Sequence, residues 1–141
     1  MTNKYLSIII MAAGKGTRML SDIPKVMHKI KGKTLLNHVI NTSAKLNPIN
    51  IITVIGYKSD LVKESVTNKE IKFSIQHKQK GTGHAVMQTE NHLKKFSGHT
   101  LILSGDVPLI KYQTLNTLVN KQINEDLNAT VLTANIKNPS G

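Results

Sequence analysis

Stretches of β-branched and aliphatic residues alternate along this chain with segments whose apolar residues recur at every third or fourth position. Short runs of the first kind predict strands, and the second spacing predicts amphipathic helices that pack on a sheet. We expect strands from residue 8 and over residues 49–55, 71–75, 100–103 and 130–136. We expect helices from a cap at Thr34 as far as the Asn47-Pro48 pair, and over residues 59–66, 82–96 and 111–123. Strands separated by helices predict an α/β fold with a Rossmann-like, doubly wound and mostly parallel sheet.

Individual positions add detail to this pattern. Thr34 and Thr82 each stand before a helical spacing, where a hydroxyl can cap the first turn. Leu61 and Val62 are expected on the apolar side of the helix over residues 59–66. The strand over residues 71–75 alternates in polarity, which predicts that one of its faces is buried.

A glycine-rich turn after the first predicted strand is the most informative feature of the chain. The apolar run ends in Ala-Ala-Gly-Lys-Gly at residues 12–16. Glycine lets the backbone turn tightly, and consecutive N–H groups in such a turn form a nest that binds anions. Lys15, Arg18 and Lys25 add fixed positive charge around it. The turn therefore predicts a polyphosphate site.

Two common glycine motifs do not fit these residues. A P-loop needs a lysine and a Ser or Thr directly after its last glycine, whereas Lys15 lies between Gly14 and Gly16. The dinucleotide fingerprint needs a third glycine at the position of Met19.

Three polar, glycine-containing segments each follow a predicted strand. They span residues 12–18, 76–82 and 104–106. Ligands of open α/β sheets bind beyond the carboxyl ends of the strands, so we expect these segments to meet at one edge.

The second segment is suited to reading a base. The Gln76 side chain carries a donor and an acceptor, and Gly81 lets a base edge reach the main chain. Together they can read a pyrimidine that carries O4 and N3–H. An ordinary strand-to-helix turn capped by Thr82 is the alternative, and the two interpretations are compatible.

The third segment places a carboxylate, Asp106, just past a buried strand, beside Gly105 and before Pro108. Mg²⁺ is usually bound through one or two protein carboxylates, while phosphates and waters complete its octahedron. The segment therefore predicts a magnesium site, although a lone aspartate after a strand can also be a turn former.

Composition narrows the class of protein. The chain has 141 residues, no cysteine and a formal net charge of +11. A nucleic-acid-binding module could explain that charge, but the lysines are scattered and Arg18 is the single arginine. We favour a solvated basic surface that suits anionic substrates, without nucleic acid or membrane partners. The absence of cysteine and of a convincing signal peptide or membrane span favours a reducing cytoplasm. No histidine spacing suggests a metal site, and no catalytic triad or carboxylate pair stands out.

The glycine turn resembles the signature of the sugar-nucleotide pyrophosphorylases, Ala-Ala-Gly-x-Gly-Thr-Arg-Met followed shortly by Pro-Lys. The matching residues are Ala12, Ala13, Gly14, Gly16, Thr17, Arg18, Met19, Pro24 and Lys25. The segment Gln-x-x-Gln-x-Gly-Thr-Gly-His-Ala at residues 76–85 resembles the uridine element of the N-acetylglucosamine-1-phosphate uridylyltransferases, the N-terminal domain of bifunctional GlmU-type enzymes. The family's Gly-Asp-x-Pro pattern recurs at residues 105–108, with Ser104 where a tyrosine is common.

The resemblance implies that UTP and N-acetylglucosamine 1-phosphate are joined into UDP-N-acetylglucosamine and pyrophosphate, for peptidoglycan and lipopolysaccharide precursors. Arg18 and Lys25 would be catalytic, and Asp106 would bind Mg²⁺. The implied substrate-binding residues are Met11, Ala12, Ala13, Gly14, Lys25, Gln76, Gly81, Thr82, Ser104, Gly105, Asp106 and Gly141.

By the same resemblance, residues 1–141 are the N-terminal, nucleotide-binding part of a nucleotidyltransferase domain. The family pattern continues with a Tyr-Gly-Arg element, with a glutamate and an asparagine that bind the acetylated sugar, and with an asparagine that completes the metal site. A β-helix acetyltransferase domain, through which full-length members form homotrimers, comes after these. Three alternatives stay open: a nucleotidyltransferase for another sugar phosphate, an inert nucleotide-binding remnant, and a basic nucleic-acid module.

Overall fold

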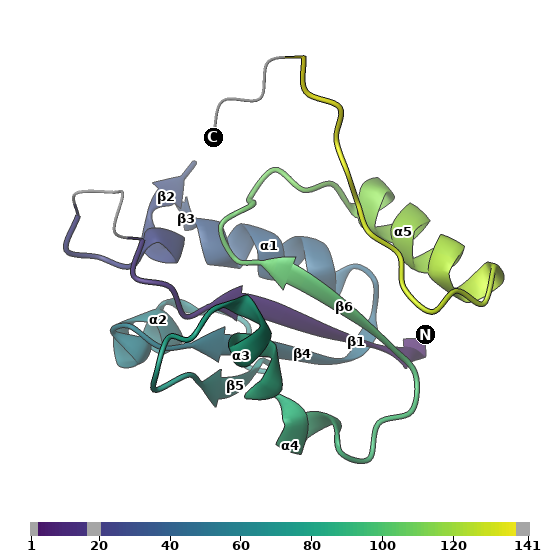
Figure 1. The fold of residues 1–141 in the computed structure, drawn as a ribbon. Coiled ribbons are helices and arrows are strands. Elements are labelled where there is room, and N and C mark those ends of the chain that lie inside the picture. The colour runs from purple at the N-terminus through teal and green to yellow at the C-terminus, as the bar shows by residue number, and fades with distance from the viewer. Residues whose placement is uncertain (1–2, 17–20, 138–141) are drawn as a thin grey trace.

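Four parallel strands form the central sheet of the molecule, in the order β5-β4-β1-β6 (Figure 1). The computed structural model describes residues 3–16 and 21–137. The strands are β1 (Asn3–Ala12), β4 (Pro48–Ile55), β5 (Lys72–Ile75) and β6 (His99–Ser104). A separate two-stranded ribbon pairs β2 (Lys29–Ile30) with β3 (Lys33–Thr34). The predicted α/β fold with a mostly parallel sheet is confirmed.

Helices cover both faces of this sheet (Figure 1). They are η1 (Lys25–Met27), α1 (Leu35–Ala44), α2 (Ser59–Ser65), α3 (Thr82–Met87), α4 (Glu90–Leu93) and α5 (Tyr112–Asn124). Apolar residues of α1, α2 and α5 share one core cluster with β1 and β6, whereas α3 packs on the opposite face. In the described residues, no helix is both long and apolar enough to cross a membrane.

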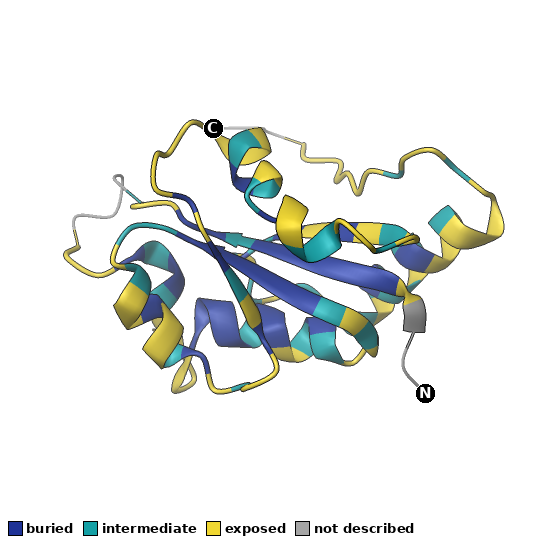
Figure 2. Ribbon diagram, turned by 90° about the horizontal axis from the view of Figure 1, so that it is seen from below, coloured by how far each residue is buried: buried dark blue, intermediate teal, exposed yellow. Residues whose placement is uncertain are grey.

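β1 is buried on both faces, which explains its unbroken apolar sequence. Ile8, Ile9 and Ile10 are 0% exposed, and they contact different core clusters on the two sides. Figure 2 shows this buried strand running through the middle of the ribbon. Because consecutive residues of a strand point to opposite faces, only a central strand buries an uninterrupted apolar run.

The structure confirms most predicted elements, but β1 begins at Asn3 and not at the predicted residue 8, because Leu6 and Ser7 already pair with β6. Thr34 caps α1, because its hydroxyl accepts a hydrogen bond from the Asn37 N–H at 3.1 Å. The strand predicted over residues 49–55 is β4, and the helix predicted over 111–123 is α5.

The last strand, predicted over residues 130–136, is wrong. These residues have no strand partner and are largely exposed, Val131 at 79%. β-Branched residues favour a strand only where a neighbouring strand pairs with their backbone. The first residues of this segment, 130–132, line a cavity together with β6 but form no ladder with it.

Three smaller predictions need correction. The helix over residues 82–96 is divided into α3 and α4 around Thr89, whose N–H and buried hydroxyl both donate to the Val86 carbonyl three residues earlier, which tightens the turn there. Leu61 is 44% exposed whereas Val62 is buried, since successive helical residues point about 100° apart. Burial in β5 does not follow the predicted alternation. Its Ser74 is buried, while Ile75 at the strand end is exposed.

Candidate functional site

A cavity of about 740 Å³ opens at the carboxyl edge of the sheet, where β1, β5 and β6 end. All three segments predicted to meet there contribute to it. The cavity is lined by Met11, Ala12, Ala13, Gly14, Gly16, Lys25, Val26, Gln76, Gln79, Gly81, Thr82, Ala85, Ser104 and Asp106. The parallel sheet brings these segments together because each strand delivers its loop to the same edge.

The glycine loop after β1 is shaped by two glycines with different surroundings. Gly16 has φ +70°, and a Cβ there would lie 2.7 Å from Lys25 Cβ. No atom lies within 4 Å of the place that a Cβ on Gly14 would occupy, so Gly14 faces open space. Gly16 therefore lets Lys25 pack against the loop, and Gly14 leaves the cavity side of the loop free.

Lys25 is fixed at the cavity by its neighbour in sequence. It begins the short helix η1, and Val26 beside it is 5% exposed within the main core. Of the three cations predicted around the glycine turn, Lys25 lines the cavity. Lys15 Nζ instead lies 5.3 Å from the centre of the Tyr57 ring, and Arg18 lies outside the described residues.

The carbonyl oxygen of Ala13, after β1, contacts the loops that follow β4 and β5. It accepts hydrogen bonds from the Tyr57 N–H at 3.2 Å and from Gln79 Nε2 at 2.6 Å. Gly56 passes so close that a Cβ would lie 3.0 Å from the carbonyl oxygens of both Ala13 and Gln76. The sequence prediction missed Gln79 as a site residue, although it stands in the uridine-element pattern three residues after Gln76.

An ion pair joins the first and third segments. Lys25 Nζ lies 2.6 Å from Asp106 Oδ2, and Ser104 Oγ donates to Asp106 Oδ1 at 2.6 Å. Partial burial raises the pKa of Asp106. Hydrogen bonds from Lys25 and Ser104, with the charge of Lys25, outweigh that effect and hold the pKa below the ordinary value. Asp106 is therefore an ionised carboxylate at neutral pH.

Gly105 positions this carboxylate and does not itself line the cavity. Its N–H donates to the Met11 carbonyl at 2.9 Å, and a Cβ there would meet the same oxygen at 3.1 Å. The segment that carries Asp106 is thereby held directly against the end of β1.

The donor set around Asp106 fits a hard divalent cation. Asp106 offers carboxylate oxygens and Ser104 a hydroxyl oxygen, and both residues line the cavity. Mg²⁺ requires only one or two protein carboxylates when phosphates supply further oxygens. Across residues 3–16 and 21–137, no group of three or more His, Cys, Asp or Glu residues could hold a metal alone. The cavity thus suits a cation that arrives with a phosphate ligand.

The base side of the cavity consists of uncharged groups. Gln76 is only 4% exposed; its Nε2 donates to the Gly81 carbonyl at 3.1 Å and lies 2.9 Å from His84 Nδ1. The predicted cap at Thr82 is wrong, because the N-cap of α3 is Gly81 and Thr82 is the first helical residue. Gly81 has φ +95°, a conformation that glycine adopts without strain.

Four residues named in the sequence analysis cannot be placed in this geometry. Thr17, Arg18, Met19 and Gly141 lie outside the described residues.

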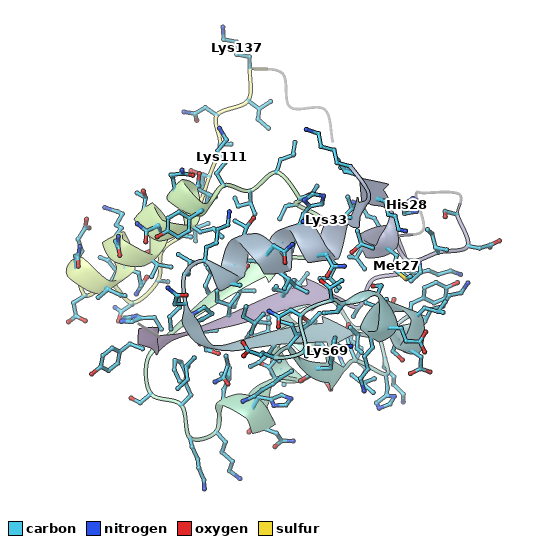
Figure 3. The ribbon with its side chains drawn as sticks, turned by 180° about the vertical axis from the view of Figure 1, so that it is seen from behind. Met27, His28, Lys33, Lys69, Lys111 and Lys137 are labelled. Carbon is cyan, nitrogen blue, oxygen red and sulfur yellow. The ribbon has the colours of Figure 1, made fainter. Side chains whose placement is uncertain are left out.

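Exposed lysines come from separate parts of the chain. Figure 3 labels Lys33 on β3, Lys69 between α2 and β5, Lys111 before α5 and Lys137 after it. This spread agrees with the interpretation of the net charge as a general surface property.

A parallel sheet with a glycine loop, a lysine and an ionised carboxylate around one cavity defines a nucleotide-binding α/β domain. Residues 8–139 match the family model of the MobA-like NTP transferase domain, and the chain belongs to this family of nucleotidyltransferases.

Two curated relatives are similar over nearly the whole chain. The bifunctional protein GlmU of Streptococcus agalactiae serotype V (strain ATCC BAA-611 / 2603 V/R) is 49% identical over 133 residues. These residues are 94% of this chain and 29% of that protein. The bifunctional protein GlmU of Streptococcus pyogenes serotype M3 is 47% identical over the same share. The chain thus spans less than a third of the length of these relatives.

Solved structures show the same fold at low identity. A nucleotidyl transferase from Methanothermobacter superposes with a TM-score of 0.70 at 18% identity, covering 82% of this chain and 57% of that one. Rv0371c from Mycobacterium tuberculosis gives a TM-score of 0.74 at 16% identity, covering 86% and 62%.

Proposed function

We propose that this chain binds UTP and N-acetylglucosamine 1-phosphate, in the reaction that forms UDP-N-acetylglucosamine and pyrophosphate. One observation carries the proposal: the Gln76 amide and the Lys25–Asp106 ion pair line the same cavity. A base-reading group and a phosphate-binding pair therefore face a single ligand. The 49% identity to a GlmU protein supports the choice of uridine and of the acetylated sugar phosphate.

In this proposal the uracil ring lies against Gln76, Gly81 and Thr82, with Ala13 and Gly14 on its other side. The triphosphate then extends along the glycine loop toward Lys25. Backbone N–H groups of the loop and the side chain of Arg18 would hold the β- and γ-phosphates.

The reaction is a displacement at the α-phosphorus of UTP. An oxygen of the sugar phosphate forms the new bond, the bond to the bridging oxygen breaks, and pyrophosphate leaves with that electron pair. The attacking phosphate oxygen is already ionised, so no protein base or nucleophile is needed, and catalysis consists of positioning and charge neutralisation. Lys25 would neutralise negative charge that gathers on the α-phosphate and the incoming phosphate.

Asp106, assisted by Ser104, would hold Mg²⁺ together with the phosphates of the substrates. Such an ion would neutralise phosphate charge as a Lewis acid. The ionised state of Asp106 and the neighbouring hydroxyl oxygen of Ser104 support this assignment.

We further propose that residues 1–141 carry the nucleotide part of the site and that groups gripping the sugar come from later parts of the family pattern. The chain covers 29% of the GlmU relative, which is consistent with this division. In this view the 141-residue chain binds UTP weakly and turns over slowly, if at all.

Two measurements on the 141-residue chain test the proposal. Titration with UTP in the presence of Mg²⁺, followed by NMR, should perturb the backbone signals of residues 13–16 and 76–82. Pyrophosphate release should stay low with N-acetylglucosamine 1-phosphate and with glucose 1-phosphate. Absent UTP binding, combined with duplex DNA binding that falls steeply with salt, would instead support a nucleic-acid module.

A further inference from the structure

The side-chain amide of Gln76 is held in one orientation. Its Nε2 lies 3.1 Å from the Gly81 carbonyl oxygen, and a carbonyl oxygen can only accept a hydrogen bond. Turning the amide over would bring two oxygens together at a residue that is 4% exposed, where a lost hydrogen bond is costly. The atom beside Gly81 is therefore the amide nitrogen.

This orientation determines the role of His84. The same Nε2 lies 2.9 Å from His84 Nδ1, and because Gln76 donates, Nδ1 must accept. A neutral imidazole accepts through one ring nitrogen only, so His84 carries its proton on Nε2. Gln88 Nε2 donates to the His84 carbonyl at 3.0 Å and also lies 3.3 Å from His84 Nε2. The two amides compete for the one acceptor nitrogen of a neutral imidazole, and the shorter contact, from Gln76 to Nδ1, assigns the acceptor to Nδ1.

Both hydrogens of the Gln76 amide are thus used inside the protein, and its Oε1 is left over. Within residues 3–16 and 21–137, no group donates a hydrogen bond to this oxygen. Gln76 lines the cavity, so the group available to a ligand there is a hydrogen-bond acceptor.

We propose that His84 is a positioning residue that locks the Gln76 amide with Oε1 as its free acceptor, and that this lock selects uracil over cytosine. Uracil presents a donor, N3–H, to such an acceptor. Cytosine has a lone pair at N3 and would place two acceptors face to face, which leaves both unsatisfied. The inference rests on the proposed function and adds the residue that sets its base specificity.

Three forms of the 141-residue chain test the lock: wild type, His84→Leu and His84→Asn. Leucine fills the space of the imidazole without an acceptor, whereas the Asn side chain can place Oδ1 where Nδ1 was. Dissociation constants for UTP and CTP with Mg²⁺ give the selectivity ratio of each form. We expect His84→Leu to lower the ratio by on the order of tenfold, the value of one ordinary hydrogen bond. His84→Asn should retain it.

The tautomer of His84 provides a test that needs no variant. Nitrogen-15 NMR of the wild-type imidazole should show Nδ1 without a proton and Nε2 with one. A proton on Nδ1 would mean that Gln76 is turned over and would overturn the proposal.

The outcomes separate this inference from the proposed function. A wild type that binds neither nucleotide, or that does not prefer UTP, contradicts the proposed function and the lock with it. If the wild type prefers UTP and His84→Leu keeps that preference, the lock alone is wrong. If both variants lose it equally, His84 acts through packing and not as an acceptor.

Discussion

The two sides of the cavity are built in different ways. On the base side, Gln76, Gly81 and His84 come from one continuous segment and contact one another through hydrogen bonds. On the phosphate side, Lys25 and Asp106 come from segments far apart in the sequence, carry opposite charges, and are partly exposed. An amide held in one orientation by hydrogen bonds suits discrimination between bases. Partly exposed charged side chains suit phosphate groups on which negative charge builds up during the reaction.

This difference separates specificity from catalysis within one pocket. A hydrogen-bonded amide offers the same group to the substrate before and during the reaction, so it contributes uniform binding. The ammonium of Lys25 interacts most strongly where charge accumulates in the transition state. We therefore expect changes on the base side to act on affinity and changes on the phosphate side to act on turnover.

The largest effect is expected from Lys25→Ala, set against Gln76→Ala on the base side. Both are best measured in a chimera in which residues 1–141 replace the matching part of the Streptococcus agalactiae relative. Removing a charge that acts in the transition state should lower kcat by about 10²–10³, with a smaller change in KM for UTP. Gln76→Ala should mainly raise KM. Lys69→Ala, at an exposed loop position, is the matched control. Unchanged kcat in Lys25→Ala would remove this residue from the mechanism. A loss of kcat in Gln76→Ala together with a rise of KM alone in Lys25→Ala would contradict the division into a base side that sets affinity and a phosphate side that sets turnover.

Asp106→Asn should have the next largest effect, since an amide keeps the shape of the carboxylate but is a weaker ligand for a cation. We expect activity in the chimera to fall by on the order of 10²-fold, with partial recovery at raised Mg²⁺ or with Mn²⁺. Asp60→Asn, on the exposed start of α2, controls for the loss of one negative charge. A variant with the wild-type metal dependence would show that Asp106 is only a structural partner of Lys25.

A pair of glycine substitutions tests whether the glycine loop positions Lys25. Gly16→Ala forces an alanine to φ +70° and brings its Cβ within 2.7 Å of Lys25 Cβ. It should lower the free energy of unfolding by about 1–3 kcal/mol in denaturant titrations. Gly14→Ala meets open space and should change stability by less than about 0.5 kcal/mol, while it weakens UTP binding. Equal stability of the two variants would contradict the close packing of Lys25 on Gly16.

Local sequence predicted the base side better than the phosphate side. The segment from Gln76 to His84 is a continuous motif, and its residues interact with one another, so its pattern contains most of the geometry. The ion pair between Lys25 and Asp106 and the Gln79 bond to Ala13 depend on how the sheet places separate loops. The sequence contains each of these residues, but it does not show which of them contact one another.

The same distinction explains the errors in the fold. β1 and β4 were predictable, because buried central strands need apolar residues throughout. The strand expected over residues 130–136 failed, because pairing depends on a neighbouring strand that composition does not specify. Thr82 resembled an N-cap by residue type, yet the backbone at that turn needs φ +95°, and the cap falls on Gly81.

The smallest effect concerns acid stability on the phosphate side. Burial raises the pKa of Asp106 in the folded protein, but the hydrogen bonds from Lys25 and Ser104 and the charge of Lys25 lower it by more, so the net shift is downward. A carboxyl with a lowered pKa stabilises the fold fully above its unfolded value and loses that contribution as pH falls through the folded value. Because both partners are partly exposed, the contribution is at most about 1 kcal/mol.

The difference in unfolding free energy between wild type and Asp106→Asn should therefore shrink as the pH is lowered from neutral to below the ordinary carboxyl range. Urea titrations at matched ionic strength measure it. A difference that grew toward acid pH would mean that burial dominates and that Lys25 does not pair with Asp106 in solution.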